Sequence, residues 1–133
     1  MIVSAKGRYA LRVMIALAAR ENTVPLKELA AQEEIPYKFL ESIMGELAKA
    51  GLVCSTRGKN GGYLLARPAT EVTAADILRV TETSFTAAAC TSDKDCPRAE
   101  ICPTLPMWKA LDEAVDELLK QYTLHDLLHG AEK

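Results

Sequence analysis

The fold is decided by residues 36–66, which read PYKFLESIMGELAKAGLVCSTRGKNGGYLLA. The first half carries an apolar stripe at helical spacing, formed by Phe39, Leu40, Ile43, Met44 and Leu47. This stripe predicts a helix from Pro36 to Ala50, where a glycine follows. Two short strands are expected next, at 52–56 and 63–66, because the RGKNGG between them contains residues that tolerate positive φ. The stretch therefore predicts a helix followed directly by a β-hairpin with a basic tip.

Two further helices are expected on the N-terminal side of this stretch. The first, from Ser4 to about Arg20, has one apolar face, which consists of Ala10, Leu11, Met14, Leu17 and Ala18. The second runs from Leu26 to about Gln32, and Pro25 suits the start of a helix. Short helices joined by a tight turn and followed by a hairpin match a winged helix-turn-helix.

Polar side chains of this unit are candidate contacts for nucleic acid. On the helix after the turn, they lie off the apolar stripe and comprise Tyr37, Lys38, Glu41 and Ser42. Arg57 and Lys59 occupy the hairpin tip, where they can reach phosphates or a narrow minor groove. Lys6 and Arg8 can contact phosphates from the start of the first helix. The alternatives are a solvated helix face and a hairpin that only aids solubility, and Cys54 in the first strand is expected to be small and half-buried.

Three of the four cysteines are evenly spaced in residues 90–102, CTSDKDCPRAEIC. Cys90, Cys96 and Cys102 follow the pattern C-x5-C-x5-C, and three thiols always leave one over if disulfides form. Thiolates are soft ligands that favour zinc or iron–sulfur clusters, so this segment is a candidate metal or cluster site that takes its last ligand from elsewhere. Two alternatives stay open, namely ordinary loop cysteines and a redox pair with a spare thiol.

The C-terminal part is expected to be helical. Capping boxes at Thr73–Asp76 and Thr123–Asp126 predict one short helix at 74–81 and another that ends near residue 129. A long helix, capped by Thr104, is expected between them. Its apolar residues alternate at spacings of three and four and comprise Trp108, Leu111, Val115, Leu118 and Tyr122. This is the spacing of a helix that pairs with another helix, so we expect a dimerisation helix, with packing inside the chain as the alternative.

Together these patterns predict a mainly α fold with a small β-hairpin. We expect a winged helix-turn-helix domain at 1–81, a cysteine segment at 82–103, and a dimerisation helix with a last short helix at 104–133. The net charge of −2 is unevenly divided, because residues 1–70 carry ten Lys and Arg against six Asp and Glu, whereas 71–133 carry six against twelve. The basic half is where a polyanion would bind.

Several functional classes are disfavoured by the sequence. No run approaches the ~18 apolar residues of a membrane span, and the apolar run after Arg12 reads better as part of an amphipathic helix than as an export signal. No nucleophile and base can be paired, and no P-loop or dinucleotide motif is present, so an enzyme is not expected. A cytoplasmic protein with reduced thiols is the consistent expectation.

These features resemble one family of bacterial regulators. The N-terminal SAKGRYAL (4–11), the hairpin RGKNGGY (57–63) and the three-cysteine segment before a long helix are similar to the Rrf2 family of winged-helix transcription regulators, in particular its iron–sulfur cluster regulators of the IscR type. The resemblance spans nearly the whole chain. It implies a homodimer that binds a double-stranded DNA operator and carries an iron–sulfur cluster, 2Fe–2S or 4Fe–4S, on Cys90, Cys96 and Cys102. It also implies that bases face Tyr37, Lys38, Glu41 and Ser42, with Arg57 in the minor groove.

The chain departs from this family at the fourth ligand. Members of the IscR type carry a histidine three residues after the third cysteine, where this chain has Leu105. Members of the NsrR type use an acidic residue of the partner's first helix, where this chain has Arg8. Neither pattern therefore supplies the fourth ligand. Nearby oxygen candidates are Asp93, Asp95 and Glu100, each more simply a solvated charge, and water or a small thiol are further options.

The resulting hypothesis is a dimeric transcription regulator whose DNA affinity is controlled by the cluster. Two recognition helices would lie about one DNA turn apart, ~34 Å, on a near-palindromic operator. One rival is a regulator switched by thiols and disulfides without metal. The other is a metal-bound protein–protein adaptor that never touches DNA.

Overall fold

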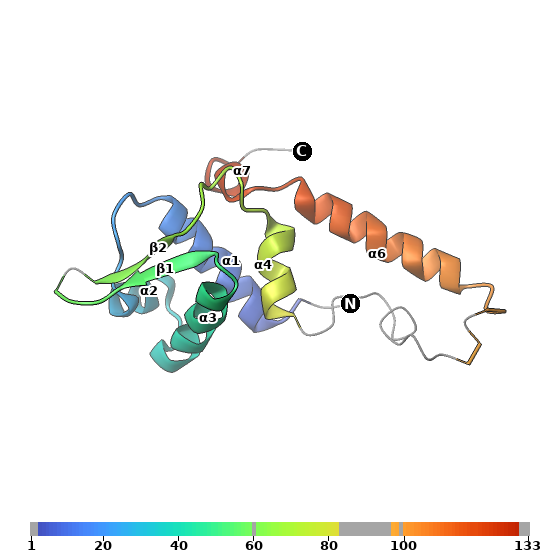
Figure 1. The fold of residues 1–133 in the computed structure, drawn as a ribbon, viewed down its shortest axis with the longest axis horizontal. Coiled ribbons are helices and arrows are strands. Elements are labelled where there is room, and N and C mark those ends of the chain that lie inside the picture. Colours follow the sequence, from blue (N-terminus) through green and yellow to red (C-terminus); the bar gives the residue numbers. More distant parts are fainter. Residues whose placement is uncertain (1–2, 60, 83–96, 99, 131–133) are drawn as a thin grey trace.

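The computed structural model describes residues 3–59, 61–82, 97–98 and 100–130. Its elements in chain order are α1 (Ala5–Ala18), α2 (Leu26–Glu33), α3 (Tyr37–Lys49), β1 (Val53–Thr56), β2 (Gly62–Leu65), α4 (Ala74–Thr81), α6 (Leu105–Lys120) and α7 (Leu124–Leu128). The two strands form an antiparallel hairpin, which confirms the expected mainly α fold with a small β-hairpin. The hairpin and the start of α6 lie toward opposite ends of the long axis (Figure 1). None of the helices so described combines the length and apolar character needed to span a bilayer.

One apolar core lies between α1, α3 and the elements that cover them. At most 2% of each side chain is exposed for the central residues of the two helices, which are Ala10, Val13, Met14, Leu17, Leu40, Ile43, Met44 and Leu47. The stripe predicted for α3 is confirmed, with Phe39 partly buried at its edge. On α1 the expected Leu11 and Ala18 are only half-buried, whereas Val13 is fully buried. The reason is that α4, α7 and β2 also pack on α1, so its buried face is wider and shifted.

A tight turn separates α2 from α3, as the sequence predicts for a helix-turn-helix. Glu34 adopts the left-handed conformation with φ of 55°. The next residue, Ile35, then enters the core with 3% exposure. The buried side chain of Ile35 holds the end of the turn against the core and so sets the direction in which α3 begins.

The hairpin, or wing, is anchored to the segment between α1 and α2. Its strands pair with Val53 opposite Leu65. On the outer side of β2, Val24 and Tyr63 exchange two backbone hydrogen bonds of 2.9 Å. This close approach requires Gly62, because its φ is +153° and an added Cβ would lie 2.4 Å from the Val24 carbonyl oxygen. The wing therefore has a fixed position relative to the helix-turn-helix.

The C-terminal end of the chain returns to the first helices. Both predicted capping boxes are present, at Thr73–Asp76 and Thr123–Asp126. The two caps lie side by side, and the Leu124 N–H donates to the Val72 carbonyl oxygen at 2.9 Å. Leu124 is fully buried, so α7 covers part of the core beside α1.

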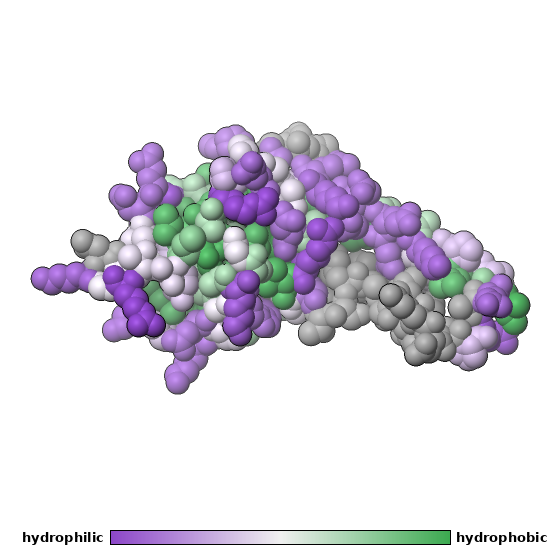
Figure 2. Space-filling model, in the orientation of Figure 1, coloured by the Kyte–Doolittle hydropathy of each residue, from purple (hydrophilic) through white to green (hydrophobic). Residues whose placement is uncertain are grey.

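The long helix α6 extends away from this core (Figure 1). Arg79 Nη2 on α4 lies 2.7 Å from Asp116 Oδ1 on α6, which ties the second half of α6 to the body. Along α6 several apolar side chains are largely exposed, among them Met107 (55%), Leu111 (43%) and Leu118 (51%). Figure 2 shows apolar surface at the end of the molecule where α6 begins. The helix therefore presents an apolar face that the described part of the chain leaves uncovered.

We predict that Gly62→Ala lowers the free energy of unfolding by about 3 kcal/mol, because the added methyl group meets the Val24 carbonyl and strains the backbone. Gly58→Ala is the matched control. Gly58 also has a positive φ, +106°, but nothing lies within 4 Å of the added carbon, so a loss of about 1–2 kcal/mol is expected. Urea unfolding followed by circular dichroism measures both. If both variants lose the same free energy of unfolding, the close approach of residue 62 to Val24 does not contribute to the cost of Gly62→Ala.

Candidate functional site

The outer face of α3 points away from the core. The four predicted contacts on this helix are all exposed, namely Tyr37, Lys38, Glu41 and Ser42. Gly45 follows on the same side, and nothing lies within 4 Å of the place a Cβ would occupy. Because Gly45 has no side chain, a partner can approach the helix backbone closely at this point. A rigid helix with such a polar face has the form that enters a major groove.

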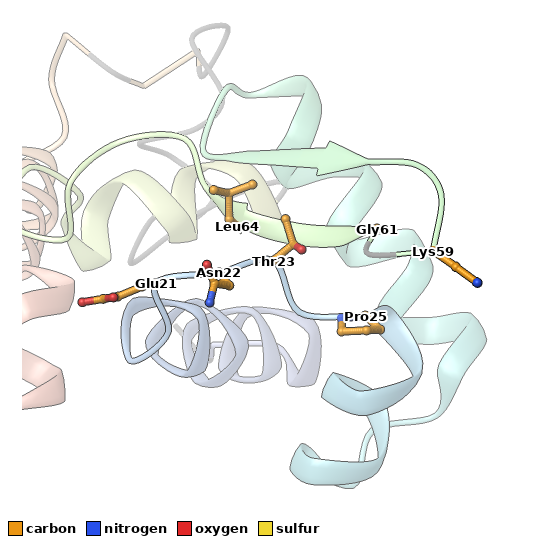
Figure 3. Close-up of a pocket in the computed structure, with 7 residues that line it drawn as sticks. All are labelled: Glu21, Asn22, Thr23, Pro25, Lys59, Gly61 and Leu64. Carbon is orange, nitrogen blue, oxygen red and sulfur yellow. The ribbon is translucent and has the colours of Figure 1, made fainter.

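The wing tip carries the second group of predicted contacts, Arg57 and Lys59, and both are exposed. A hollow of about 630 Å³ lies on one side of the wing, between it and the segment before α2. Figure 3 shows Lys59 pointing outward at one end of this hollow, with Glu21 at the opposite end. The cationic group of Lys59 is thus directed away from the body of the protein.

Cys54 is exposed, and the prediction that it would be half-buried is wrong. Within β1 only Val53 is buried, because the wing has two strands and leaves most of β1 in contact with solvent. The sequence shows a strand at this point but does not show which neighbours cover it.

The cations at the start of α1 differ in their surroundings. Lys6 Nζ lies 2.5 Å and 2.7 Å from the two carboxylate oxygens of Glu46 on α3. Arg8 is exposed. Arg12 donates to the carbonyl oxygen of Glu33, and its Nε lies 3.4 Å from the Glu33 carboxylate. Lys6 therefore ties α1 to α3, a contact that the sequence does not reveal because its partners are 40 residues apart.

Cys102 is the one predicted cluster ligand among the described residues, and it lies three residues before Leu105, the first residue of α6. Cys90 and Cys96 lie outside the described residues. The Sγ atom of Cys102 is 3.2 Å from Oγ1 of Thr104. Hydrogen bonding by the Thr104 hydroxyl, and then by its backbone N–H, lowers the pKa of the Cys102 thiol. A partly exposed thiol held toward its thiolate form is suited to binding a metal or attacking a disulfide.

Thr104 does not cap α6 with its side chain, contrary to the prediction. Its backbone is helical, with φ of −94° and ψ of −15°, whereas the other two capping threonines are extended. The hydroxyl of Thr104 contacts Cys102 instead. The same residue type thus has a different role here because a cysteine stands two residues before it.

The surroundings of Cys102 bear on a fourth ligand. Leu105 is buried with 9% exposure, so a hydrophobic side chain fills the position at which the IscR type has histidine. Glu100 is exposed, while Asp93 and Asp95 lie outside the described residues. Within the residues that the structure describes, no three His, Cys, Asp or Glu side chains are grouped to hold a metal ion.

The end of α4 binds the start of α1, a contact that was not predicted. The Ser4 N–H donates to Glu82 Oε1 at 2.7 Å, and the Ser4 hydroxyl donates to Glu82 Oε2 at 2.6 Å. Burial would raise the pKa of Glu82, but the hydrogen bonds from Ser4, together with smaller contributions from Thr81 and the charge of Lys6, outweigh it and the pKa is lowered. Gly7 makes room, because a Cβ there would lie 3.2 Å from the Glu82 carboxylate and 3.1 Å from Leu78. A glycine in the first turn of a helix is the sequence signal that could have indicated this close packing.

The sequence is similar to known proteins over nearly its full length. A family profile described as Rrf2, iron-dependent transcriptional regulator, matches residues 3–130. The HTH-type transcriptional regulator IscR of Pectobacterium carotovorum is 33% identical, with 99% of this chain and 82% of that protein covered. The IscR of Erwinia tasmaniensis is 34% identical, with 99% and 81% covered.

Solved structures show the same arrangement of elements. CymR, the global cysteine regulator of B. subtilis, is 34% identical with a TM-score of 0.80, and 99% of each chain is covered. IscR of T. potens is 34% identical with a TM-score of 0.76, covering 99% of this chain and 89% of that one. The oxidised form of Staphylococcus aureus CymR is 35% identical with a TM-score of 0.74, covering 100% and 98%.

We predict that Thr104→Val raises the pKa of the Cys102 thiol, because it removes the hydroxyl that lowers this pKa. The measurement is the rate of alkylation by iodoacetamide against pH, in reduced, metal-free protein in which Cys54, Cys90 and Cys96 are replaced by serine. The midpoint of the profile should move to higher pH. Thr104→Ser keeps a hydroxyl and should retain the original midpoint. Identical profiles for the valine and serine variants would contradict the role of the hydroxyl.

Proposed function

The chain belongs to the Rrf2 family of transcriptional regulators, and from this premise we propose that it is a homodimer whose affinity for operator DNA depends on an iron–sulfur cluster. It is an IscR-like DNA-binding regulator and not an enzyme, as the sequence predicted. An adaptor that never touches DNA is not supported by this family membership. The observation that carries the DNA-binding part of the proposal is the exposed polar face of α3 beside a basic wing. Action in the cytoplasm, where thiols stay reduced, is part of the proposal.

In this proposal α3 enters the major groove and the wing contacts the adjoining backbone or minor groove. Lys38, Glu41 and Ser42 would contact base edges, with Tyr37 at the start of the helix as a further DNA contact. Arg57 and Lys59 would contact phosphates or a narrow minor groove. Arg8 is exposed and could bind a phosphate directly, whereas Lys6 would have to leave Glu46 to do so. We therefore expect Lys6 to contribute less to phosphate binding than Arg8.

The proposed dimer contact is the apolar face of α6. Its residues recur at the spacing of paired helices, and Leu111 and Leu118 expose 43% and 51% of their surface. Exposed apolar side chains in a row on a helix are costly unless a partner covers them. A second copy of the same face would cover them and would place two α3 helices about one DNA turn apart, ~34 Å.

The residue types of the cysteine segment suit the ligand chemistry of a cluster. Cys102 offers a partly exposed thiol with a lowered pKa, and Cys90 and Cys96 stand on the same segment of the sequence. These three residues would hold a 2Fe–2S or a 4Fe–4S cluster. When bound, such a cluster supplies one-electron redox chemistry. A fourth ligand would have to come from a group other than Leu105, whose hydrocarbon side chain has no donor atom and is buried.

Contacts at both edges of the cysteine segment favour communication with the DNA-binding unit. At one edge Glu82 binds Ser4 at the start of α1, and Lys6 on the same helix binds α3. At the other edge Cys102 leads into α6, which is ion-paired to α4. We propose that the state of the three cysteines acts on α3 through these contacts and shifts the population that is competent to bind DNA.

A thiol-switched regulator without metal is the second candidate. The lowered pKa of the Cys102 thiol favours it, because a thiolate attacks disulfides and is readily oxidised. The similar structure of S. aureus CymR, solved in an oxidised form, supports the same possibility. In this version two of the three cysteines would pair reversibly.

We predict that anaerobic reconstitution with iron and sulfide yields coloured protein that contains iron and acid-labile sulfide. Loaded and metal-free protein should differ about 5- to 150-fold in affinity for a duplex selected from a random library by the wild-type protein, since allosteric coupling is typically about 1–3 kcal/mol. Cys102→Ser should lose both the colour and the difference. Cys54→Ser, which changes an exposed cysteine on the wing, should keep both.

The same preparations separate the two candidates. Colourless protein without iron and sulfide after reconstitution would remove the cluster from the proposal. If such protein loses two hydrogens in mass under oxidant and regains them with reductant, with a parallel change in DNA affinity, the thiol switch is supported instead. A wild-type protein that selects no duplex in any state would contradict DNA binding itself.

We predict that Leu111→Glu combined with Leu118→Glu converts the dimer to a monomer in size-exclusion chromatography with light scattering. Affinity for the selected duplex should fall about 100-fold or more, because the two halves no longer bind as one unit. Helical content should not change, since both side chains are exposed. Ala110→Glu adds a charge at an exposed position off the stripe and should leave the dimer intact. A double variant that remains dimeric would place the interface elsewhere.

A further inference from the structure

A second hollow, of about 500 Å³, lies between the wing and the starts of α2 and α3. Three separate elements contribute to its lining. Lys27 comes from α2, Tyr37 is the first residue of α3, and Arg57 follows β1. The hollow is thus built where the recognition helix and the wing approach each other.

The charged residues in the lining of this hollow are all cationic. The lining includes two cations, Lys27 and Arg57, and hydroxyl groups from Tyr37, Ser55 and Thr56. None of its described lining residues carries a carboxylate. The hollow on the other side of the wing differs, because Glu21 belongs to its lining (Figure 3). Cations and hydroxyl donors without an acid are the groups that recognise a phosphate.

The two helices that begin at this hollow add to the same chemistry. The residues before them, Pro25 and Pro36, make no side-chain cap hydrogen bond, so neither covers the first-turn N–H groups with a side-chain acceptor. Helix α3 has no acidic residue in its first turn. The acid in the first turn of α2, Glu28, is not part of the lining and approaches Arg20 at 3.5 Å. The positive ends of both helices therefore reinforce the cations.

We propose that this hollow binds one phosphate of the DNA backbone, held by Lys27 and Arg57 with Tyr37 and the wing hydroxyls as hydrogen-bond donors. The inference rests on the proposed DNA-binding function and adds Lys27, which belongs to neither α3 nor the wing. A strand that passes from the groove entered by α3 to the region reached by the wing must cross the gap between them. The phosphate of that strand therefore meets the hollow, and its position sets the depth of α3 in the groove.

The test compares Lys27→Met with Lys109→Met, which removes the same charge from an exposed position on α6. Affinity is measured against salt for the duplex selected by wild-type protein and for a scrambled duplex. Lys27→Met should weaken both complexes by a similar factor, roughly tenfold, because a phosphate contact carries no sequence information. The plot of log affinity against log salt should become shallower by about one unit per half-site. Lys109→Met and the charge-conserving Lys27→Arg should follow the wild type.

Ethylation interference identifies the phosphate itself. In each half-site, ethylation of one phosphate should block binding of the wild-type protein. Ethylation of the same phosphate should not change the affinity of Lys27→Met further. Wild-type binding together with an unchanged salt slope and interference pattern for Lys27→Met would overturn the inference and leave the proposed function intact. Lys27-dependent binding of inorganic phosphate, without a change in the interference pattern, would overturn it in favour of a free-anion site. Failure of the wild type to bind either duplex would overturn the proposed function, and this inference with it.

Discussion

The burial of one face of α3 beside α1 is the constraint on which the rest of the structure depends. The four innermost side chains of this face are completely buried, namely Leu40, Ile43, Met44 and Leu47. Each contributes about 1.5–3 kcal/mol, so α3 cannot rotate about its axis without a large loss of stability. The ion pair of Lys6 with Glu46 holds the same orientation at the edge of the core. The polar residues on the other side of α3 are consequently held facing solvent.

Segments that are far apart in the sequence are joined around this helix pair by backbone pairing and capping contacts. Val24 pairs with Tyr63 of the wing, Thr73 with Thr123, and Ser4 with Glu82. These contacts leave two parts projecting from the body, the wing and α6 (Figure 1). Binding of DNA at one end and of a second copy at the other is consistent with this division, since the core separates the two surfaces.

The sequence predicts those features that depend on local spacing. The stripe of α3 and the two capping boxes at Thr73 and Thr123 are confirmed because they are set within a few residues. The role of Thr104 was mistaken, since Cys102 takes its hydroxyl. The contacts of Lys6 with Glu46 and of Ser4 with Glu82 could not be predicted, because periodicity does not show which helices meet. The cysteine pattern indicates a ligand set, but its fourth member requires a neighbour that the sequence does not identify.

The anchoring of α6 has a mechanical consequence. Arg79 and the segment leading into α7 hold its second half, while Cys102 stands before its first residue, at the opposite end. The helix has 16 residues and is therefore about 24 Å long. Its first residue, Leu105, is only 9% exposed, so this end is packed as well, and α6 is a rigid connection between the side of Cys102 and the ion pair with α4. A shift of either end along the helix axis would therefore move the other end with it, because a helix does not stretch.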